Sequence, residues 1–396
     1  MRESLNSQLF QKIVTVRRDL HRFPELSWEE KRTAQAISDF LKQEGIAHRS
    51  EVAGTGVIAD IPGPPKVPCV VIRADMDALP IQEETELEFS SAHSGVMHAC
   101  GHDGHTAMVL GAAQLLSQES TLPAPVRFIF QPAEEKGAGA LAMIKEGVLD
   151  QAGMIFGGHL DRHGKAGSII VSEGPVNASS DMFRIEITGQ GAHGARPHES
   201  IDAVVVGSLM IMALQTIVSR EVDPAFPSVV SVGTFQAGTA SNVIAGQAIL
   251  EGTIRAQHPH VREHLQTAIK RIADSIGQLH GAVVKITMTK GTPPVINTQE
   301  MTLLVKEAAK QAVGLENIFP LRTANMGGED FSYYLEKIPG AYVRFGGQVP
   351  GRENYPAHSS KFDFDEQALA IGANYFYHVA LLAGENLQQQ SQTGEQ

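Results

Sequence analysis

The sequence predicts an α/β fold with a largely parallel sheet and, inserted into it, a smaller ferredoxin-like α+β domain. Helix-like and strand-like segments alternate over the first part of the chain, which is the pattern of a sheet with helices packed on its faces. In the middle of the chain the order becomes strand, helix, strand, strand, helix, strand, as in a ferredoxin-like sandwich. A length of 396 residues is too great for one ordinary core and agrees with this division.

The larger domain takes its elements from both ends of the chain. Val67–Ala74 and Val126–Gln131 are short apolar runs suited to buried strands, and Met154–Gly158 predicts a third strand. Helical periodicity covers five further segments, which are Leu5–His21, Trp28–Glu44, Thr106–Leu116, Ala138–Glu146 and Glu366–Leu382.

The inserted domain begins where the pattern changes near Asp181. Phe183–Thr188 alternates apolar and polar residues, as a half-exposed strand does. The chain returns to the first pattern near Thr298, so we expect one domain of residues 1–181 with 296–396 and another of residues 182–295. The elements predicted after the first strand of the insert are Ala203–Arg220 (helix), Val229–Phe235 and Ala248–Arg255 (strands), Val261–Ile276 (helix) and Val283–Thr289 (strand).

The most apolar stretch of the chain is Ala203–Val218. It contains Ser208 and Gln215, and no stretch approaches the roughly 20 apolar residues that a membrane helix needs. The helix predicted at Ala203–Arg220 is apolar around most of its circumference. It either lies buried under its own sheet or meets another subunit with part of its surface, and the sequence favours neither alternative.

The composition excludes several classes of partner. A net charge of −12, with 32 basic and 44 acidic residues and no long Lys/Arg run, argues against nucleic acid and anionic membranes. Two cysteines cannot build a disulfide framework, and the charged N-terminal segment lacks an apolar signal-peptide core, so we expect a cytoplasmic protein. The 16 histidines are notable because histidine is a common metal ligand and acid–base group.

Acidic and imidazole side chains follow the three predicted strands of the larger domain. Asp75 and Asp77 follow the first strand, Glu134 and Glu135 the second, and His159 the third. Because the carboxyl ends of parallel strands meet at one edge of a sheet, we expect these groups to converge. One glutamate of the pair can bind a metal while the other acts as general base, although an isolated Glu-Glu pair is more often a solvated turn.

A second cluster, HACGHDGH, runs from His98 to His105. Cys100 and His102 alternate around Gly101, so both can reach one ion from a tight loop. A lone histidine or cysteine is more often structural, but this many polar groups in eight residues are costly to desolvate without an ion or a hydrogen-bond network. A different enzyme class stays open, a cysteine hydrolase with Cys100 as nucleophile and His102 or His105 as base.

Nine short motifs carry a family resemblance over nearly the whole chain. They are HRFPE from His21, RADMDALP from Arg73, HACGHDGH from His98, QPAEE from Gln131, GHL from Gly158, GAHGARP from Gly191, GTIR from Gly252, GEDF from Gly328 and AH from Ala357. Each is weak alone, but in this order they resemble the M20 metallopeptidase family. Within that family they are similar to the amidohydrolase subgroup of aminoacylases, hippurate hydrolases, N-acetyl-diaminopimelate deacetylases and auxin-conjugate hydrolases.

The resemblance implies a catalytic domain that holds two divalent metal ions, Zn²⁺ or Mn²⁺, with Co²⁺ or Ni²⁺ as substitutes. Cys100 stands where the family has the ligand that bridges the two metals. His102 and His159 would complete one metal site, and Glu135 and His358 the other. The inserted domain is then a lid, and in this family the lid usually carries a homodimer interface.

The chain departs from the family pattern at one place. Many members have a His-x-Asp motif where this chain has Asp75-Met76-Asp77, so Asp75 stands where the histidine would be. His102 is expected to supply the missing imidazole. Asp77 is expected to orient a metal ligand without binding the metal itself.

The resemblance also implies a reaction, which is hydrolysis of the amide bond of an N-acyl (N-acetyl-like) amino acid to a carboxylate and a free amino acid. Glu134 is the expected general base, and His193 is expected to reach the substrate carbonyl, often from the partner subunit. Arg255 is expected to clamp the free carboxylate, with Asn242 donating a hydrogen bond nearby. Local sequence alone favours a turn histidine for His193, and for Arg255 and Asn242 it leaves a surface polar residue and a binding residue equally open. Three alternatives stay open, a metallo-dipeptidase, a carboxypeptidase and a non-catalytic protein that binds a small acid.

Overall fold

The computed structural model describes residues 6–393, which divide into two compact units. Unit 1 contains the chain up to Gly174, then Ile296–Arg322, then the chain from Asp330. Unit 2 contains Pro175–Val295 and the short segment Thr323–Glu329. The chain therefore enters unit 2 at Pro175, a few residues before the expected boundary at 181/182. It also contributes a second, short segment to unit 2, Thr323–Glu329, which lies after the expected end of the insert. The predicted start of the first helix, Leu5, lies outside the described residues.

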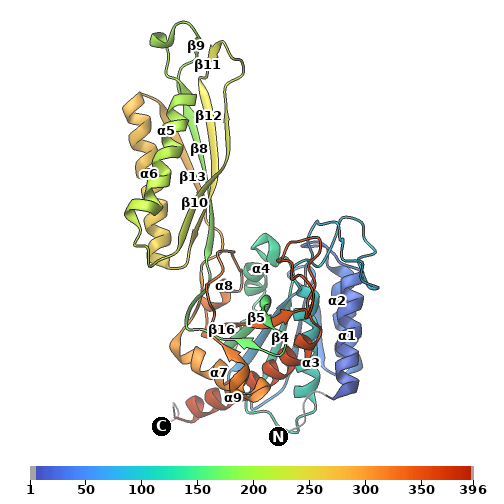
Figure 1. The fold of residues 1–396 in the computed structure, drawn as a ribbon. Helices are drawn as coiled ribbons and strands as arrows, with labels where there is room; N and C mark the ends of the chain where they lie inside the picture. Colours follow the sequence, from blue (N-terminus) through green and yellow to red (C-terminus); the bar gives the residue numbers. More distant parts are fainter. Residues whose placement is uncertain (1–5, 394–396) are drawn as a thin grey trace. The chain divides into compact units, whose positions relative to one another are not determined.

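Unit 1 is built on a sheet of eight strands in the order β1-β2-β4-β3-β5-β16-β6-β15 (Figure 1). Its centre is parallel and consists of β3 (Cys69–Asp75), β4 (Val126–Gln131), β5 (Ala152–Lys165) and β16 (Gly340–Gln348), so the prediction of a largely parallel sheet is confirmed. The other strands of this sheet are β1 (Ala47–Val52), β2 (Gly56–Ile61), β6 (Ile169–Ile170) and β15 (Ile318–Phe319).

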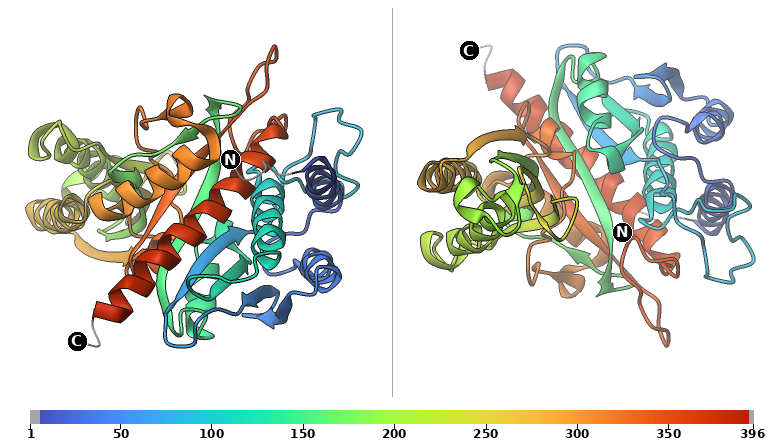
Figure 2. Two further views of the ribbon diagram at one scale, coloured as in Figure 1. Left: turned by 90° about the horizontal axis from the view of Figure 1, so that it is seen from below. Right: turned by 90° about the horizontal axis from the view of Figure 1, so that it is seen from above.

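Helices complete the layers of unit 1. Figure 2 shows α9 (Gln367–Thr393) crossing one face of the sheet between α7 (Gln299–Val313) and α3 (His102–Ser117). The core beneath them includes the buried rings of Phe128 and Phe156. The remaining helices of this unit are α1 (Ser7–Arg22), α2 (Lys31–Gln43), α4 (Gly139–Lys145) and α8 (Ser332–Leu335).

Unit 2 is an antiparallel sheet in the order β10-β12-β8-β13, with the two helices α5 and α6 packed on it. The chain order of these elements is strand, helix, strand, strand, helix, strand, so the ferredoxin-like prediction is confirmed. The elements are β8 (Ser179–Thr188), α5 (Ala203–Thr216), β10 (Ser228–Ala237), β12 (Gln247–Ala256), α6 (Pro259–His280) and β13 (Val283–Thr289). Four short strands remain, which are β7 (Gly174–Asn177), β9 (Ala192–His193), β11 (Val243–Ile244) and β14 (Val295–Asn297).

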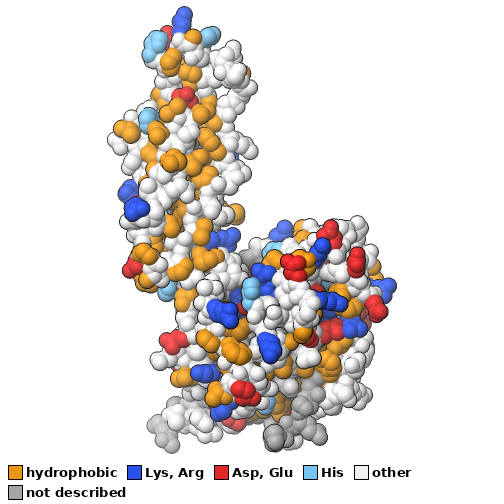
Figure 3. All heavy atoms as spheres, in the orientation of Figure 1, with side chains coloured by type: hydrophobic (Ala, Val, Ile, Leu, Met, Phe, Trp, Pro, Cys, Tyr) orange, Lys and Arg blue, Asp and Glu red, His pale blue; other side chains and the backbone are white. Residues whose placement is uncertain are grey.

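Helix α5 has two apolar faces. Its buried residues, including Val206 and Met210, belong to the core of unit 2. The opposite side chains of Val205 and Met212 are 47% and 69% exposed, and Figure 3 shows hydrophobic side chains gathered on unit 2. The helix ends in a π turn at Ile217–Glu221, where the sequence predicts continued α-helix. By length and composition Ala203–Glu221 could cross a membrane, but one such helix is weak evidence, because helices of ordinary cores pass the same test.

Candidate metal centre and catalytic site

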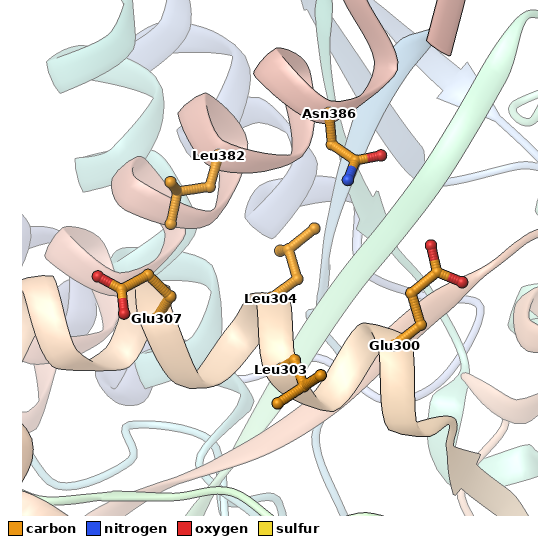
Figure 4. A pocket seen from close by; sticks show the side chains of 6 residues that line it. All are labelled: Glu300, Leu303, Leu304, Glu307, Leu382 and Asn386. Carbon is orange, nitrogen blue, oxygen red and sulfur yellow. The ribbon is translucent and has the colours of Figure 1, made fainter. Parts of the chain in front are cut away.

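A surface hollow of about 330 Å³ lies between α7 and α9 (Figure 4). It is lined by Leu303, Leu304 and Leu382 with Glu300, Glu307 and Asn386 around them. None of these residues belongs to the predicted ligand set. The candidate site is therefore the polar cluster formed by residues at the end of β3, after β4 and within β5.

The loop before α3 places two candidate ligands around one glycine. Gly101 precedes the helix with φ 85°, in the left-handed region that favours glycine. A Cβ at this position would lie 2.8 Å from Cδ1 of Leu160. The tight turn at Gly101 therefore places Cys100 just before the N-terminus of α3, and His102 is the first residue of the helix.

Two groups of three potential ligands share Cys100. One consists of Cys100, His102 and His159, and the other of Cys100, Glu135 and His358, with the ligand atoms of each group within 4.8 Å of one another. The Cys100 Sγ lies 3.3 Å from Nε2 of His159, and His358 Nε2 lies 3.3 Å from a carboxylate oxygen of Glu135. The structure thus brings together all five residues that the resemblance suggested as ligands.

The hydrogen bonds of two histidines fix the ring nitrogen that is free to bind a metal. Nδ1 of His102 lies 2.9 Å from the carbonyl oxygen of Asp77 and 3.2 Å from its Oδ1, and Nδ1 of His159 lies 2.7 Å from the carbonyl oxygen of Leu160. Each Nδ1 therefore carries the proton that it donates, which leaves Nε2 as the nitrogen for a metal. Burial keeps His159 neutral, whereas burial of His102 is outweighed by the charge of Asp75, which raises the pKa of His102 well above its usual value, so His102 releases the Nε2 proton when a cation binds. In the described part of the chain, the buried Nε2 of His102 has no hydrogen-bond partner.

His105 and Asp75 also lie beside this cluster but are already engaged. Nδ1 of His105 is 2.6 Å from Oδ1 of Asp75, and its Nε2 accepts a hydrogen bond from the backbone of Leu160 at 3.0 Å. Arg73 donates to the second oxygen of Asp75 at 2.7 Å. The aspartate that replaces the family's usual histidine therefore forms a buried ion pair, and no ring nitrogen of His105 is left for a metal.

The electrostatics of the cluster favour a bound cation. Burial raises the pKa of the Cys100 thiol well above its usual value, and the charge of Glu135 raises it further. Burial, with the nearby His105, lowers the pKa of His159 well below its usual value and keeps this imidazole neutral. A buried thiol, one carboxylate and three imidazoles match the donors that Zn²⁺ and related divalent ions use. The residues present therefore fit a metal centre.

Glu134 and Glu135 lie in a short 3-10 turn, and the carboxylate of Asp77 accepts hydrogen bonds from the backbone of this turn. The backbone N–H groups of Glu134 and Glu135 donate to the two oxygens of Asp77 at 3.2 and 3.1 Å. Ser27 also donates to Asp77, at 2.7 Å. Asp77 thus contacts both His102 and the glutamate turn, and its role in orienting a metal ligand stays a prediction.

The two glutamate side chains make different contacts. Glu135 meets His358, whereas Glu134 accepts a hydrogen bond at 3.4 Å from the backbone N–H of Asp330. Asp330 is itself held by Gln131 at 2.8 Å and Arg73 at 2.8 Å. The sequence analysis assigned no role to Asp330 or Arg73. Arg73 lies in the motif RADMDALP and Asp330 in the motif GEDF, and an arginine and an aspartate in two motifs of one site could have been expected to pair.

The remaining predicted residues lie in unit 2, at two different ends of its sheet. His193 lies in β9 and pairs with Val243 in β11, the two neighbouring short strands labelled in Figure 1. The carbonyl oxygen of Asn242 accepts a hydrogen bond from the backbone of Gly194 at 2.8 Å. Arg255 is near the other end of β12, eight residues after Gln247, which is about 26 Å of strand. The structure therefore brings His193 and Asn242 together and separates both from Arg255.

Two local features suit His193 and Arg255 to binding. Nδ1 of His193 accepts a hydrogen bond at 3.0 Å from the backbone of Ala195, so the ring proton is on the exposed Nε2. Within residues 6–393 no hydrogen-bond partner is found for the half-buried guanidinium of Arg255. Burial lowers the pKa of Arg255, which stays charged at physiological pH.

Comparisons with known proteins agree with this site. Residues 71–382 match peptidase family M20/M25/M40. The chain is 41% identical to an N-acetyl-L-cysteine deacetylase of Bacillus subtilis, over 94% of this chain and 88% of the relative. It is 38% identical to thermostable carboxypeptidase 1 of Saccharolobus solfataricus, over 91% of this chain and 92% of that protein.

A solved structure has the same fold. It is a Bacillus subtilis protein described as a dinuclear metal binding peptidase of the M20 family, with a TM-score of 0.84 and 38% identity. The alignment covers 96% of this chain and 99% of that one. The match spans both units, the cluster around Cys100 included. The chain belongs to peptidase family M20/M25/M40, and it is a metal-dependent hydrolase of amide bonds.

Proposed function

We propose that the protein removes the acyl group from N-acyl amino acids, with N-acetyl-like groups preferred. The observation that carries this proposal is the cluster around Cys100, in which five potential ligands and a vicinal glutamate converge. The similarity to an N-acetyl-L-cysteine deacetylase supports the substrate class. We assign Cys100, His102, Glu135, His159 and His358 as ligands of two divalent ions, Zn²⁺ or Mn²⁺, which Co²⁺ or Ni²⁺ can replace.

The residues of the chain divide the chemistry among them. When bound, the metal ions polarise the amide carbonyl and lower the pKa of the attacking water. Glu134 accepts the proton of that water and returns it to the leaving amine. The Nε2–H of His193 donates to the developing oxyanion, with Asn242 beside it. Arg255 binds the free carboxylate of the substrate through its planar fork.

The positions within unit 2 support a site built from two copies of the chain. A span of about 26 Å along β12 is longer than a small N-acyl amino acid, so Arg255 and His193 of one copy cannot hold the same molecule. We propose a homodimer through unit 2, in which the exposed apolar face of α5 is covered by the second copy. A cytoplasmic location belongs to the same proposal.

A mixing experiment tests the shared site. His193→Ala and Glu134→Gln should each be nearly inactive, but mixed dimers contain one site with neither change. After dissociation and random reassociation in equal amounts, about a quarter of wild-type turnover is expected, measured on an N-acetyl amino acid. The control mixes wild type with the double variant. A mixed dimer of these two chains has no site in which both Glu134 and His193 are unchanged. If the two single variants restore nothing when mixed, His193 does not act across the dimer.

A substrate panel tests the role of Arg255 and the substrate class. N-acetyl, N-benzoyl and N-succinyl amino acids should be cleaved faster than the same compounds with an amidated carboxyl group. Arg255→Lys keeps the charge but loses the bidentate fork, so kcat/KM for the free acids should fall roughly 10- to 100-fold while the amides change little. Equal losses for acids and amides would contradict the clamp. Dipeptides in the same panel test the carboxypeptidase alternative, which the 38% identity to a carboxypeptidase favours.

A further inference from the structure

Glu30 stands directly before α2 but does not cap it. A carboxylate at this position ordinarily accepts hydrogen bonds from the first N–H groups of its own helix. Here that task falls to Glu25, which accepts from the backbone of Arg32 at 3.1 Å and from Thr33 through its backbone at 2.8 Å and its hydroxyl at 3.0 Å. The side chain of Glu30 is therefore free for another task.

The carboxylate of Glu30 is buried and joins two distant segments. Its residue is 0% exposed, one oxygen accepts from the backbone N–H of Ala133 at 2.9 Å, and the other accepts from the Thr55 hydroxyl at 2.6 Å. Burial raises the pKa of Glu30, and these two hydrogen bonds oppose that rise. Burying a carboxylate costs folding free energy, so we infer that the hydrogen bond from Ala133 to Glu30 serves a function in the segment that contains Ala133.

The segment held by Glu30 is the start of the glutamate turn. Ala133 has φ 53° and ψ 41°, the left-handed conformation that a residue with a Cβ adopts only when its surroundings enforce it. Three consecutive N–H groups are bound by buried carboxylates, that of Ala133 by Glu30 and those of Glu134 and Glu135 by Asp77. If Ala133 relaxed to a right-handed or extended conformation, the direction of the chain after it would change, and Glu134 would move.

We propose that Glu30 is a positioning residue for hydrolysis, which holds the left-handed backbone of Ala133 and thereby aims the carboxylate of Glu134. This inference rests on the proposed role of Glu134 as general base. The hydrogen bonds of the Glu30 carboxylate go to Ala133 and Thr55, neither of which is a proposed metal ligand or the proposed base. Removal of this carboxylate should therefore affect turnover more than substrate affinity or metal content.

Three substitutions of Glu30 test the proposal, with kcat, KM, bound metal per subunit and Tm measured for each. Glu30→Ala leaves Ala133 N–H without its acceptor, and kcat should fall roughly 100-fold, as for a misplacement of about 1 Å, with KM and metal content nearly unchanged. Glu30→Asp is too short to reach both donors and should lose roughly 10-fold in kcat. Glu30→Gln keeps an oxygen for Ala133 and turns its amide to the Thr55 hydroxyl, so it should retain most of the turnover.

Glu25→Ala is the matched control. It removes the same kinds of hydrogen bond, from backbone N–H groups and a threonine hydroxyl, at the start of the same helix. It should lower Tm but leave kcat unchanged. The proposal is overturned if Glu30→Ala lowers Tm without lowering kcat, or if the loss of kcat only follows a loss of bound metal. Should Glu30→Ala not fold, Glu30→Asp decides by the same comparison.

Glu134→Gln, measured beside these variants, separates the two proposals. If Glu134→Gln turns over normally, the assignment of the general base fails. If it is inactive while Glu30→Ala and Glu30→Asp turn over normally, only the positioning role of Glu30 fails. When both roles hold, adding Glu30→Ala to Glu134→Gln should cost nothing further in kcat, because the two residues act on one step.

Discussion

Glu134→Gln should lower kcat by roughly 10³-fold or more while the protein keeps its metal. General acid–base catalysis by one positioned group contributes about 10²- to 10⁴-fold, and here a single carboxylate serves both proton transfers. Glutamine has the same shape, and its oxygen can still accept the hydrogen bond from Asp330 that Glu134 accepts at 3.4 Å. The turn that carries Glu135 should therefore stay in place, and metal content is measured alongside kcat.

Glu135→Gln is the companion variant for this prediction. Glu135 lies 3.3 Å from His358 in a group of potential ligands with Cys100, so the amide should weaken metal binding and lower both metal content and kcat. The pair of neighbours thus gives two distinguishable outcomes, loss of turnover alone and loss of turnover with metal. If Glu134→Gln retained wild-type kcat, or if it lost metal in parallel with Glu135→Gln, the assignment of Glu134 as the base would be wrong.

The convergence of ligands could be predicted because it follows from sheet geometry. Asp75 ends β3, and Glu134 and Glu135 follow β4, as predicted, whereas β5 continues past His159 to Lys165, so His159 lies within its strand and not after it. The three strands are parallel and adjacent, so these side chains still lie close together. What the sequence could not separate was a ligand from a supporting histidine. His102 and His105 look alike in HACGHDGH, and only the backbone N–H of Leu160, far along the chain, occupies the second ring nitrogen of His105.

Parts of the fold and site were beyond sequence reasoning for similar reasons. The strand β16 (Gly340–Gln348) contains glycines and the buried Arg344, so it lacks the simple apolar run that marks β3. Asn242 was expected near Arg255, but their separation depends on the antiparallel register of β12, which sets Arg255 opposite Ser180 and away from β11. The role of Glu30 was invisible because its partners, Thr55 and Ala133, are 25 and 103 residues away.

Exhaustive removal of divalent metal should abolish activity and also lower thermal stability. Without a cation, the site buries the thiol of Cys100, the unpartnered Nε2 of His102 and the carboxylate of Glu135 close together. Removing these groups from water costs free energy, and a bound ion offsets that cost by pairing with them. The metal-bound protein should therefore have a higher Tm than the metal-free protein. Treatment with EDTA or dipicolinate followed by assay and thermal scan measures both effects, and Zn²⁺, Mn²⁺, Co²⁺ or Ni²⁺ should restore them.

Cobalt gives a readout that does not depend on turnover. Co²⁺ bound by a thiolate has an absorption band that reports the sulfur ligand, so Cys100→Ser should lose this band. Cys69→Ser is the matched control, because Cys69 is also a buried free thiol but lies in β3 away from the ligand groups. It should keep the band, the metal and the activity.

The same experiment decides between the two roles considered for Cys100. A cysteine nucleophile needs a low thiol pKa, whereas burial and the neighbouring carboxylate raise the pKa of Cys100 in the absence of a cation. His102 and His159 also direct their Nδ1 protons to backbone carbonyls, an orientation typical of metal-binding histidines that bind through Nε2. Full activity after complete metal removal, with inactivation by thiol alkylation, would reverse this conclusion and restore the cysteine hydrolase.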